Sequence, residues 1–180
     1  MLPPGEATPT IDARPVFGLP LRLPDDLRRG PVVLAFVGPL ESPLAREALD
    51  DLKARWAELD LLGVRLVAIS PTTLALAQDY VPRHQLLFPL VLDPERALAR
   101  SFGVAEDAQV SAALGGLRPA RVRRLVRALG RGGLVRRAPF GARVALVLLG
   151  RDGRVRWTSQ AESPLDGPDM PGLLSAVKDS

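Results

Sequence analysis

The sequence of 180 residues contains no cysteine and a single histidine, His84. Without a thiol, the chain cannot form disulfides, bind zinc through thiolates or use a sulfur nucleophile. One histidine gives no His pair for zinc, and it could serve a Ser-His-Asp triad only if folding brought it to a serine. We therefore expect no metal, no cofactor and no catalytic residue, and we expect His84 at the surface or at a helix end.

Long apolar runs are also missing. No stretch approaches the ~18 to 20 continuous apolar residues of a membrane span, and the first residues lack the basic start and apolar run of a signal peptide. We therefore expect a cytoplasmic protein without a transmembrane segment. The length and a hydrophobic fraction of 47% predict a single domain over residues 1–180 with a substantial core.

Acidic residues are absent from residues 108–150, which carry nine arginines. Since the net charge of the whole chain is +4, the remainder carries −5. A mildly acidic body therefore carries one strongly basic segment. Between residues 117 and 141 only Phe140 could stack on a base, whereas proteins that bind single-stranded nucleic acid usually present several aromatic rings.

Five segments have the composition of β-strands: residues 31–37, 64–70, 88–92, 144–149 and 154–158. The last two are joined through Asp152-Gly153, which predicts a hairpin. Residues 1–30 are rich in proline and glycine. They predict a loose lead-in with a short hairpin around residues 16–23 that covers a sheet edge.

Ser42-Pro43 has the pattern of a helix start, because an N-cap residue precedes proline at the first helical position. The helix that begins there is expected to run to about Leu61. Further helices are expected at residues 72–80, 94–102 and 119–130 and from about residue 169 onward. This order of elements predicts an α/β sandwich whose mixed sheet begins parallel and finishes antiparallel.

Six short motifs extend along nearly the whole chain: Pro31-Val-Val-Leu-Ala-Phe, Ser42-Pro-Leu-Ala-Arg-Glu, Leu66-Val-Ala-Ile-Ser-Pro, Phe88-Pro-Leu-Val-Leu-Asp-Pro, Asp152-Gly-Arg-Val-Arg-Trp and Ser163-Pro-Leu-Asp-Gly-Pro. In this order and spacing they resemble the alkyl hydroperoxide reductase and thiol-specific antioxidant (AhpC/TSA) family, especially its peroxiredoxin-like 2 branch. The resemblance implies a thioredoxin-like (peroxiredoxin-like) sandwich with a mixed central sheet flanked by helices. Residues 104–142 would form a basic helical insertion before the final hairpin.

The resemblance also locates the active-site positions. In that branch a Cys-Pro-x-Cys-Arg-Glu turn opens the first main helix, and the residues that match its start are Ser42, Pro43 and Ala45. Both cysteines are therefore replaced, while serine at an N-cap and alanine in a helix retain the turn. The active-site arginine of peroxiredoxins falls on Val144 by register. Arg143 would lie on the opposite face of the strand, so we do not assign it that role.

Ser42 has two further interpretations beside that of a structural N-cap, which we favour. A serine nucleophile would need an adjacent base and an oxyanion hole, and no histidine lies nearby in the sequence. Alternatively, the helix N-terminus at residues 42–45 could bind an anion through free amides.

The basic segment contains a predicted helix that Pro119 begins and Gly130 ends. Its apolar stripe consists of Val122, Leu125, Val126 and Leu129. Arginines off this stripe form a basic interaction face: Arg118, Arg121, Arg124, Arg127 and Arg131. Three interpretations stay open. The stripe could pack on the rest of the chain while the arginines are solvated or pair with acidic residues; the face could bind a protein partner or a second copy; or it could bind nucleic acid or an anionic membrane surface.

Retained motifs without cysteine predict a redox-inactive peroxiredoxin-like protein that acts by binding, scaffolding or self-assembly and has no thiol peroxidase activity. One alternative is a phosphate- or nucleic-acid-binding accessory protein that uses the arginine-rich segment. Another is an enzyme with non-thiol chemistry near Ser42.

Overall fold

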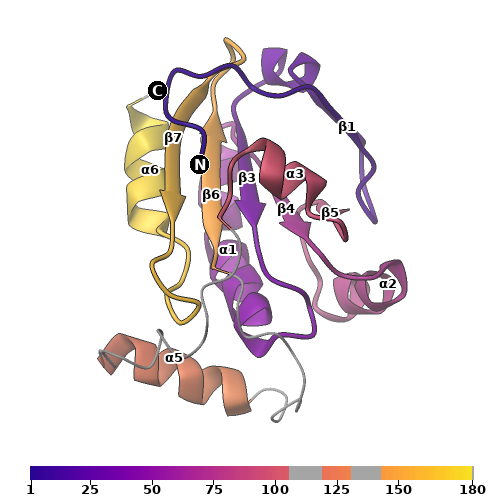
Figure 1. The fold of residues 1–180 in the computed structure, drawn as a ribbon, viewed down its shortest axis with the longest axis vertical. Helices are drawn as coiled ribbons and strands as arrows, with labels where there is room; N and C mark the ends of the chain where they lie inside the picture. Colours follow the sequence, from indigo (N-terminus) through magenta and orange to yellow (C-terminus); the bar gives the residue numbers. More distant parts are fainter. Residues whose placement is uncertain (106–118, 131–142, 180) are drawn as a thin grey trace.

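The computed structural model describes residues 1–105, 119–130 and 143–179 (Figure 1). Its elements are, in chain order, β1 (Ile11–Ala13), β2 (Leu21–Leu23), the 3₁₀ helix η1 (Asp25–Arg28), β3 (Val32–Phe36), α1 (Pro43–Leu61), β4 (Arg65–Ser70), α2 (Leu74–Arg83), β5 (Leu90–Leu92), α3 (Ala97–Ser101), α5 (Pro119–Gly130), β6 (Ala145–Leu149), β7 (Val155–Gln160) and α6 (Met170–Lys178).

A five-stranded mixed sheet in the order β5-β4-β3-β6-β7 forms the centre of the structure. β3, β4 and β5 are parallel, and β6 and β7 continue the sheet in antiparallel pairing. All residues of the central strand β3 are buried, because both of its faces are covered. The predicted mixed sheet, parallel first and antiparallel at the end, is confirmed.

Helices cover both faces of this sheet (Figure 1). On one face α1, α2 and α6 contribute buried side chains such as Leu49, Tyr80 and Leu173. On the other face, Phe102 just after α3 and Leu21 of the lead-in belong to a second apolar cluster. This arrangement is the thioredoxin-like sandwich that the sequence predicts.

The N-terminal hairpin differs from its prediction around residues 16–23. Its strands are β1 and β2, and residues 14–20 form the connection between them. The reason is that this connection pairs elsewhere: Pro15 forms an antiparallel bridge with Val91 on the edge strand β5. The predicted role of the lead-in, covering a sheet edge, is confirmed.

Two helices differ from their predicted lengths. α2 was expected to end before Pro82 but continues to Arg83, because the amide of His84 donates to the Tyr80 carbonyl at 3.0 Å and closes the last turn. α3 is shorter than residues 94–102. It begins only at Ala97, and the Asp93 side chain accepts hydrogen bonds from the amides of Leu98 and Ala99 in its first turn.

Candidate functional site

Ser42 lies at the N-cap position of α1 with extended backbone angles (φ −79°, ψ 124°). Its side chain accepts no hydrogen bond from the helix amides, so the residue occupies the cap position without the predicted capping bond. Both Ser42 and Ala45, where the resemblance expects the two cysteines, are only 3% exposed. Pro43 between them is also buried. The side chains at the degenerate active-site positions are therefore closed to solvent.

Polar side chains near this turn fix the path of the backbone. Arg46 donates from Nε to the Leu40 carbonyl at 2.6 Å, and its guanidinium carbon lies 5.9 Å from the centre of the Tyr80 ring. The Ser70 hydroxyl donates to the Gly38 carbonyl at 2.9 Å. These groups hold the turn in shape.

His84 is the C-cap of α2, so its predicted place at a helix end is confirmed. Its ring stacks on Tyr80 with the ring centres 4.1 Å apart and the planes 20° from parallel. The His84 carbonyl accepts a hydrogen bond from Lys53 Nζ at 2.7 Å. Within the described ranges the imidazole makes no hydrogen bond to Ser42, so this geometry does not pair a serine nucleophile with a base.

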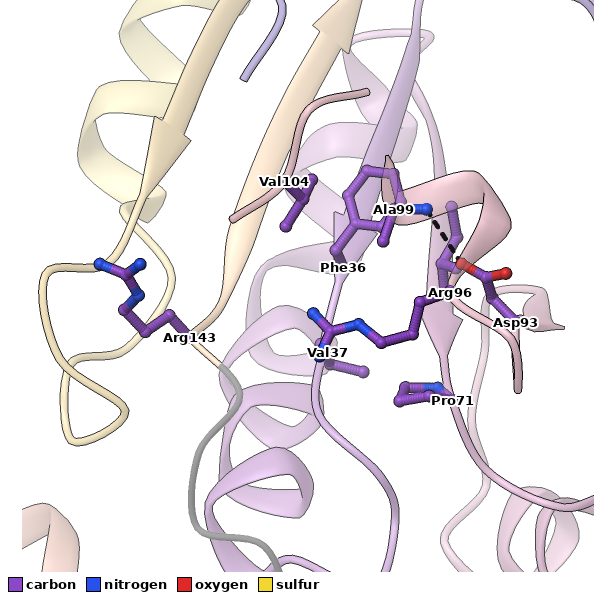
Figure 2. A pocket seen from close by; sticks show the side chains of 9 residues that line it. Phe36, Val37, Pro71, Asp93, Arg96, Ala99, Val104 and Arg143 are labelled. Atoms are coloured by element: carbon purple, nitrogen blue, oxygen red, sulfur yellow. Dashed lines mark hydrogen bonds between the residues drawn. The ribbon is translucent and has the colours of Figure 1, made fainter. Parts of the chain in front are cut away.

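A cavity of about 20 Å³ lies beside the carboxyl ends of β3 and β4 (Figure 2). Figure 2 shows Arg96 extending from the start of α3 toward Val37, while Asp93 accepts the Ala99 amide at 2.9 Å. Arg143, just before β6, also lines the cavity, and its Nε is buried without a hydrogen-bond partner among the described residues. The cavity has room for about one water molecule and is too small for an organic substrate.

The two residues at the start of β6 lie on opposite sides of the sheet, as predicted. Val144 belongs to the apolar cluster beneath α1 and α6, whereas Arg143 lines the cavity on the other side. That Val144 occupies the position of the active-site arginine of peroxiredoxins stays a prediction from the resemblance.

The helix α5 lies beside α1 (Figure 1), and its arginines form ion pairs with α1 and with the loop before α6. The ion pairs are Arg121–Asp166, Arg124–Asp51 and Arg127–Glu47. The first is bidentate, with Nε–Oδ1 at 2.8 Å and Nη2–Oδ2 at 2.9 Å. The side chains of Arg121 and Arg124 are 13% and 7% exposed, and that of Glu47 is 1% exposed. Partial burial strengthens such pairs relative to ion pairs at the open surface.

The Ser163-Pro-Leu-Asp-Gly-Pro motif forms the turn that presents Asp166 to this helix. The amide of Ser163 donates to Asp166 Oδ2 at 3.0 Å, and the amide of Asp166 donates to the Ser163 carbonyl at 2.9 Å. The hydrogen bond from Arg121 to Asp166 raises the pKa of the guanidinium, so Arg121 stays cationic. A Cβ at Gly167 would lie 2.5 Å from Arg124 Nη1, so a larger residue there would force the guanidinium or the loop to shift.

Two residues of the predicted apolar stripe of α5 are exposed to solvent. Val122 is 40% exposed and Val126 is 62% exposed, so at these two positions the predicted apolar stripe does not pack on the rest of the chain. The side chains of Leu125 and Leu129, its other two members, lie outside what the structure describes. With Ala120, Arg123 and Arg127 the two valines line a hollow of about 550 Å³. The helix therefore directs Arg121 and Arg124 toward the rest of the chain and two valines toward solvent.

The structure places three of the five arginines of the predicted basic face, Arg121, Arg124 and Arg127, against carboxylates. This agrees with the interpretation that they pair with acidic residues. The other two members, Arg118 and Arg131, lie outside the described residues. Whether the face also binds a partner stays a prediction.

The acidic partners were missed at the sequence level. Glu47 and Asp51 are one helical turn apart on α1, a spacing that places both carboxylates on the same side of the helix. Arg124 and Arg127 are three residues apart on α5, a spacing that matches that of the two carboxylates. This matched spacing was the one signal in the sequence that could have indicated the pairing. Nothing in the sequence indicated that these two helices touch.

The described ranges contain no group of three or more His, Asp or Glu side chains arranged to hold a metal ion. None of the helices in these ranges combines the length and apolar character needed to cross a bilayer.

Comparison with known proteins gives a consistent family. The family model described as "AhpC/TSA family" matches residues 4–157. Among solved structures, a cysteine-to-serine mutant of peroxiredoxin 6 from Arenicola marina is similar with a TM-score of 0.69 and 17% identity, over 99% of this chain and 73% of that chain. Peroxidoxin BcpB from Mycobacterium tuberculosis has a TM-score of 0.63 and 20% identity, with 98% and 96% of the two chains covered. Peroxiredoxin Q from Xanthomonas campestris has a TM-score of 0.63 and 18% identity, with 94% and 90% covered. No curated protein matches.

Proposed function

Because this chain belongs to the AhpC/TSA family yet contains no cysteine, we propose that it is a redox-inactive peroxiredoxin-like protein that works by binding another protein. The observation that carries the proposal is the state of the two active-site positions. Ser42 and Ala45 replace the cysteines that the resemblance expects, and both side chains are buried. Reduction of a peroxide by a thiol would require a reactive thiolate that the peroxide can reach.

The surface supports a binding role. A fold that has lost its catalytic residues can still bind other molecules through its surface. Here ion pairs attach α5 to the rest of the chain, and Val122 and Val126 of α5 are exposed. Exposed apolar side chains beside cationic ones are typical of protein interaction sites. Binding, scaffolding and self-assembly all use such a surface.

The other two functions that the sequence left open have less support. A site for phosphate or nucleic acid would use exposed arginines, whereas Arg121 and Arg124 are turned toward carboxylates of the same chain. Non-thiol catalysis near Ser42 would need a reachable hydroxyl and a base, whereas this side chain is 3% exposed.

The catalytic half of the proposal is tested with the purified full chain and a panel of alkyl and hydrogen peroxides. We expect peroxide consumption equal to that of buffer, with dithiothreitol or thioredoxin as reductant. A matched sample of a cysteine-containing peroxiredoxin shows that the assay works. Turnover by the cysteine-free chain would overturn the proposal.

The binding half is tested by mixing the full chain with a companion that co-purifies from the source cells and has itself been purified. Light scattering should give a complex of fixed stoichiometry. A chain that stays monomeric and binds none of its co-purifying companions under these conditions does not act in the way proposed.

A further inference from the structure

The outer face of α5 combines an apolar hollow with a cationic rim. Val122 and Val126 lie one helical turn apart and are 40% and 62% exposed. Together with Ala120 they form the apolar part of a hollow whose rim includes Arg123 and Arg127. The hollow has a volume of about 550 Å³, and all of its lining residues lie on α5.

The charges on this face are available to a ligand. Arg123 is exposed and forms no ion pair within the part of the chain that the structure describes. Arg127 is 58% exposed even though its Nε contacts Glu47. No acidic residue occurs on α5 itself, so the face carries positive charge only. A complementary ligand must therefore supply both aliphatic groups and carboxylates.

We infer that the outer face of α5 receives an acidic amphipathic helix of a partner protein, an inference that rests on the proposed function. Side chains three and four residues apart lie on one face of a helix, so a helical segment can place aliphatic groups between Val122 and Val126. Glutamates beside those aliphatic residues would reach the guanidinium groups of Arg123 and Arg127. The recognition is that of a helix in a groove.

Two other occupants fit the observations less well. A nucleic acid strand would need several free arginines or aromatic rings, and α5 has no aromatic residue while Arg121 and Arg124 are engaged with carboxylates. An anionic membrane would need a larger apolar face than two valines provide, usually with tryptophan or phenylalanine. The apolar hollow with few charges is best matched by a peptide.

The probe is a fluorescein-labelled synthetic helix of about 15 residues with leucines at i, i+3, i+4 and i+7 and glutamates on either side of them. Fluorescence anisotropy with the full chain should give saturable binding. Val126→Asp and Arg123→Glu should each weaken binding by at least about tenfold, because one inserts a charge into the hollow and the other reverses a charge on its rim. A peptide with lysines in place of the glutamates should bind Arg123→Glu better than the unaltered chain.

Matched controls make the same changes elsewhere on the surface. Leu61→Asp alters a residue that is 88% exposed at the end of α1, and Arg28→Glu reverses an exposed arginine in η1. Both variants should bind the peptide as the unaltered chain does. Circular dichroism of all four variants shows that each is folded.

Several results would overturn the inference: no binding at about 1 mM protein, equal binding by Val126→Asp and the unaltered chain, or preference of the unaltered chain for the lysine peptide. Self-association that Val126→Asp abolishes would assign the face to a second copy, and tighter binding to anionic vesicles than to the peptide would assign it to a membrane. If a purified companion still binds both Val126→Asp and Arg123→Glu at full strength, this inference fails while the proposed function stands. Peroxide turnover would instead refute the proposed function.

Discussion

Replacing Asp51 by asparagine should loosen α5 from α1 while leaving the sheet intact. The Asp51 carboxylate accepts a hydrogen bond from Arg124, whose side chain is 7% exposed. Among the residues that the structure describes, Nε and Nη2 of the same guanidinium are buried without hydrogen-bond partners. Asparagine keeps the shape of aspartate but removes its charge, so the buried cation loses its counter-charge.

The size of the effect follows from the degree of burial. Removing one partner of a fully buried ion pair costs about 3 to 5 kcal/mol, whereas an exposed pair contributes about 0 to 1 kcal/mol. The Asp51 side chain is 32% exposed, so solvent screens part of the interaction. We expect an intermediate loss of about 1.5 to 3 kcal/mol in the docking of α5, which corresponds to roughly a 10- to 100-fold change in its opening equilibrium.

Hydrogen exchange followed by mass spectrometry measures this opening directly. A helix of 12 residues is only marginally stable alone, so the amides of α5 lose protection when it leaves α1. In Asp51→Asn they should exchange roughly 10 to 100 times faster, with β3 and β4 unchanged. Asp60→Asn makes the same change at an exposed position of α1 and should have no effect. Unchanged protection of α5 in Asp51→Asn, or an equal loss in Asp60→Asn, would refute the reasoning.

Three further predictions concern the same contacts and the degenerate site. Gly167→Ala should accelerate exchange of α5, because its Cβ would lie 2.5 Å from Arg124 Nη1; unchanged exchange would show that the loop yields without cost. Because the pKa of Arg121 is raised, its ion pair stabilises the docking of α5 fully at any pH below the pKa of an unpaired arginine. This stabilisation is lost only in strongly alkaline solution. Exchange of α5, corrected for the intrinsic rate, should therefore show no loss of protection between about pH 7 and pH 10. Finally, the cysteine-free chain allows single thiols to be introduced: Ser42→Cys should react with a thiol reagent at least about 100 times more slowly than the exposed Ser175→Cys in the native state, and equally fast in denaturant. Rapid native reaction of Ser42→Cys would show that the site is open.

The central sheet could be predicted from sequence because its signals are local. The apolar runs at residues 31–37 and 64–70 became β3 and β4, since strands covered on both faces require continuous apolar sequence. Asp152-Gly153 fixed the final hairpin, and Gly153 adopts the positive φ of 75° that such a turn requires. The lead-in hairpin was predicted with the wrong bounds because its connection pairs with β5, a contact that no local pattern reveals.

The candidate site, too, could be predicted from the sequence only where its signals are local. Ser42 was placed correctly at a helix start because an N-cap residue followed by proline is a local signal. The ion pairs of α5 were not predictable, since Arg124 and Asp51 are 73 residues apart and Arg121 and Asp166 are 45 apart. Only the folded chain brings these residues together.

The exposure of Val122 and Val126 on α5 has an energetic explanation. An amphipathic helix usually buries its apolar stripe, and burying a valine contributes about 1.5 to 3 kcal/mol. A hydrogen bond to a charged group contributes a similar amount, about 1.5 to 3 kcal/mol. Here three arginines meet three carboxylates, whereas two valines are left exposed. The surface beneath α5 is acidic, so the orientation with the arginines inward is favoured.

This orientation also explains part of the uneven charge distribution. In the described helix, Arg121, Arg124 and Arg127 are matched by carboxylates from elsewhere in the chain, so the acidic body and the basic segment neutralise each other at their contact. A protein that used Arg121 or Arg124 for phosphate binding would have to break its own ion pairs first, which reduces the affinity gained from each contact. The basic composition of α5 is therefore accounted for first by its docking to α1. The outward side, where Arg123 adjoins the exposed valines, is the part left for a partner.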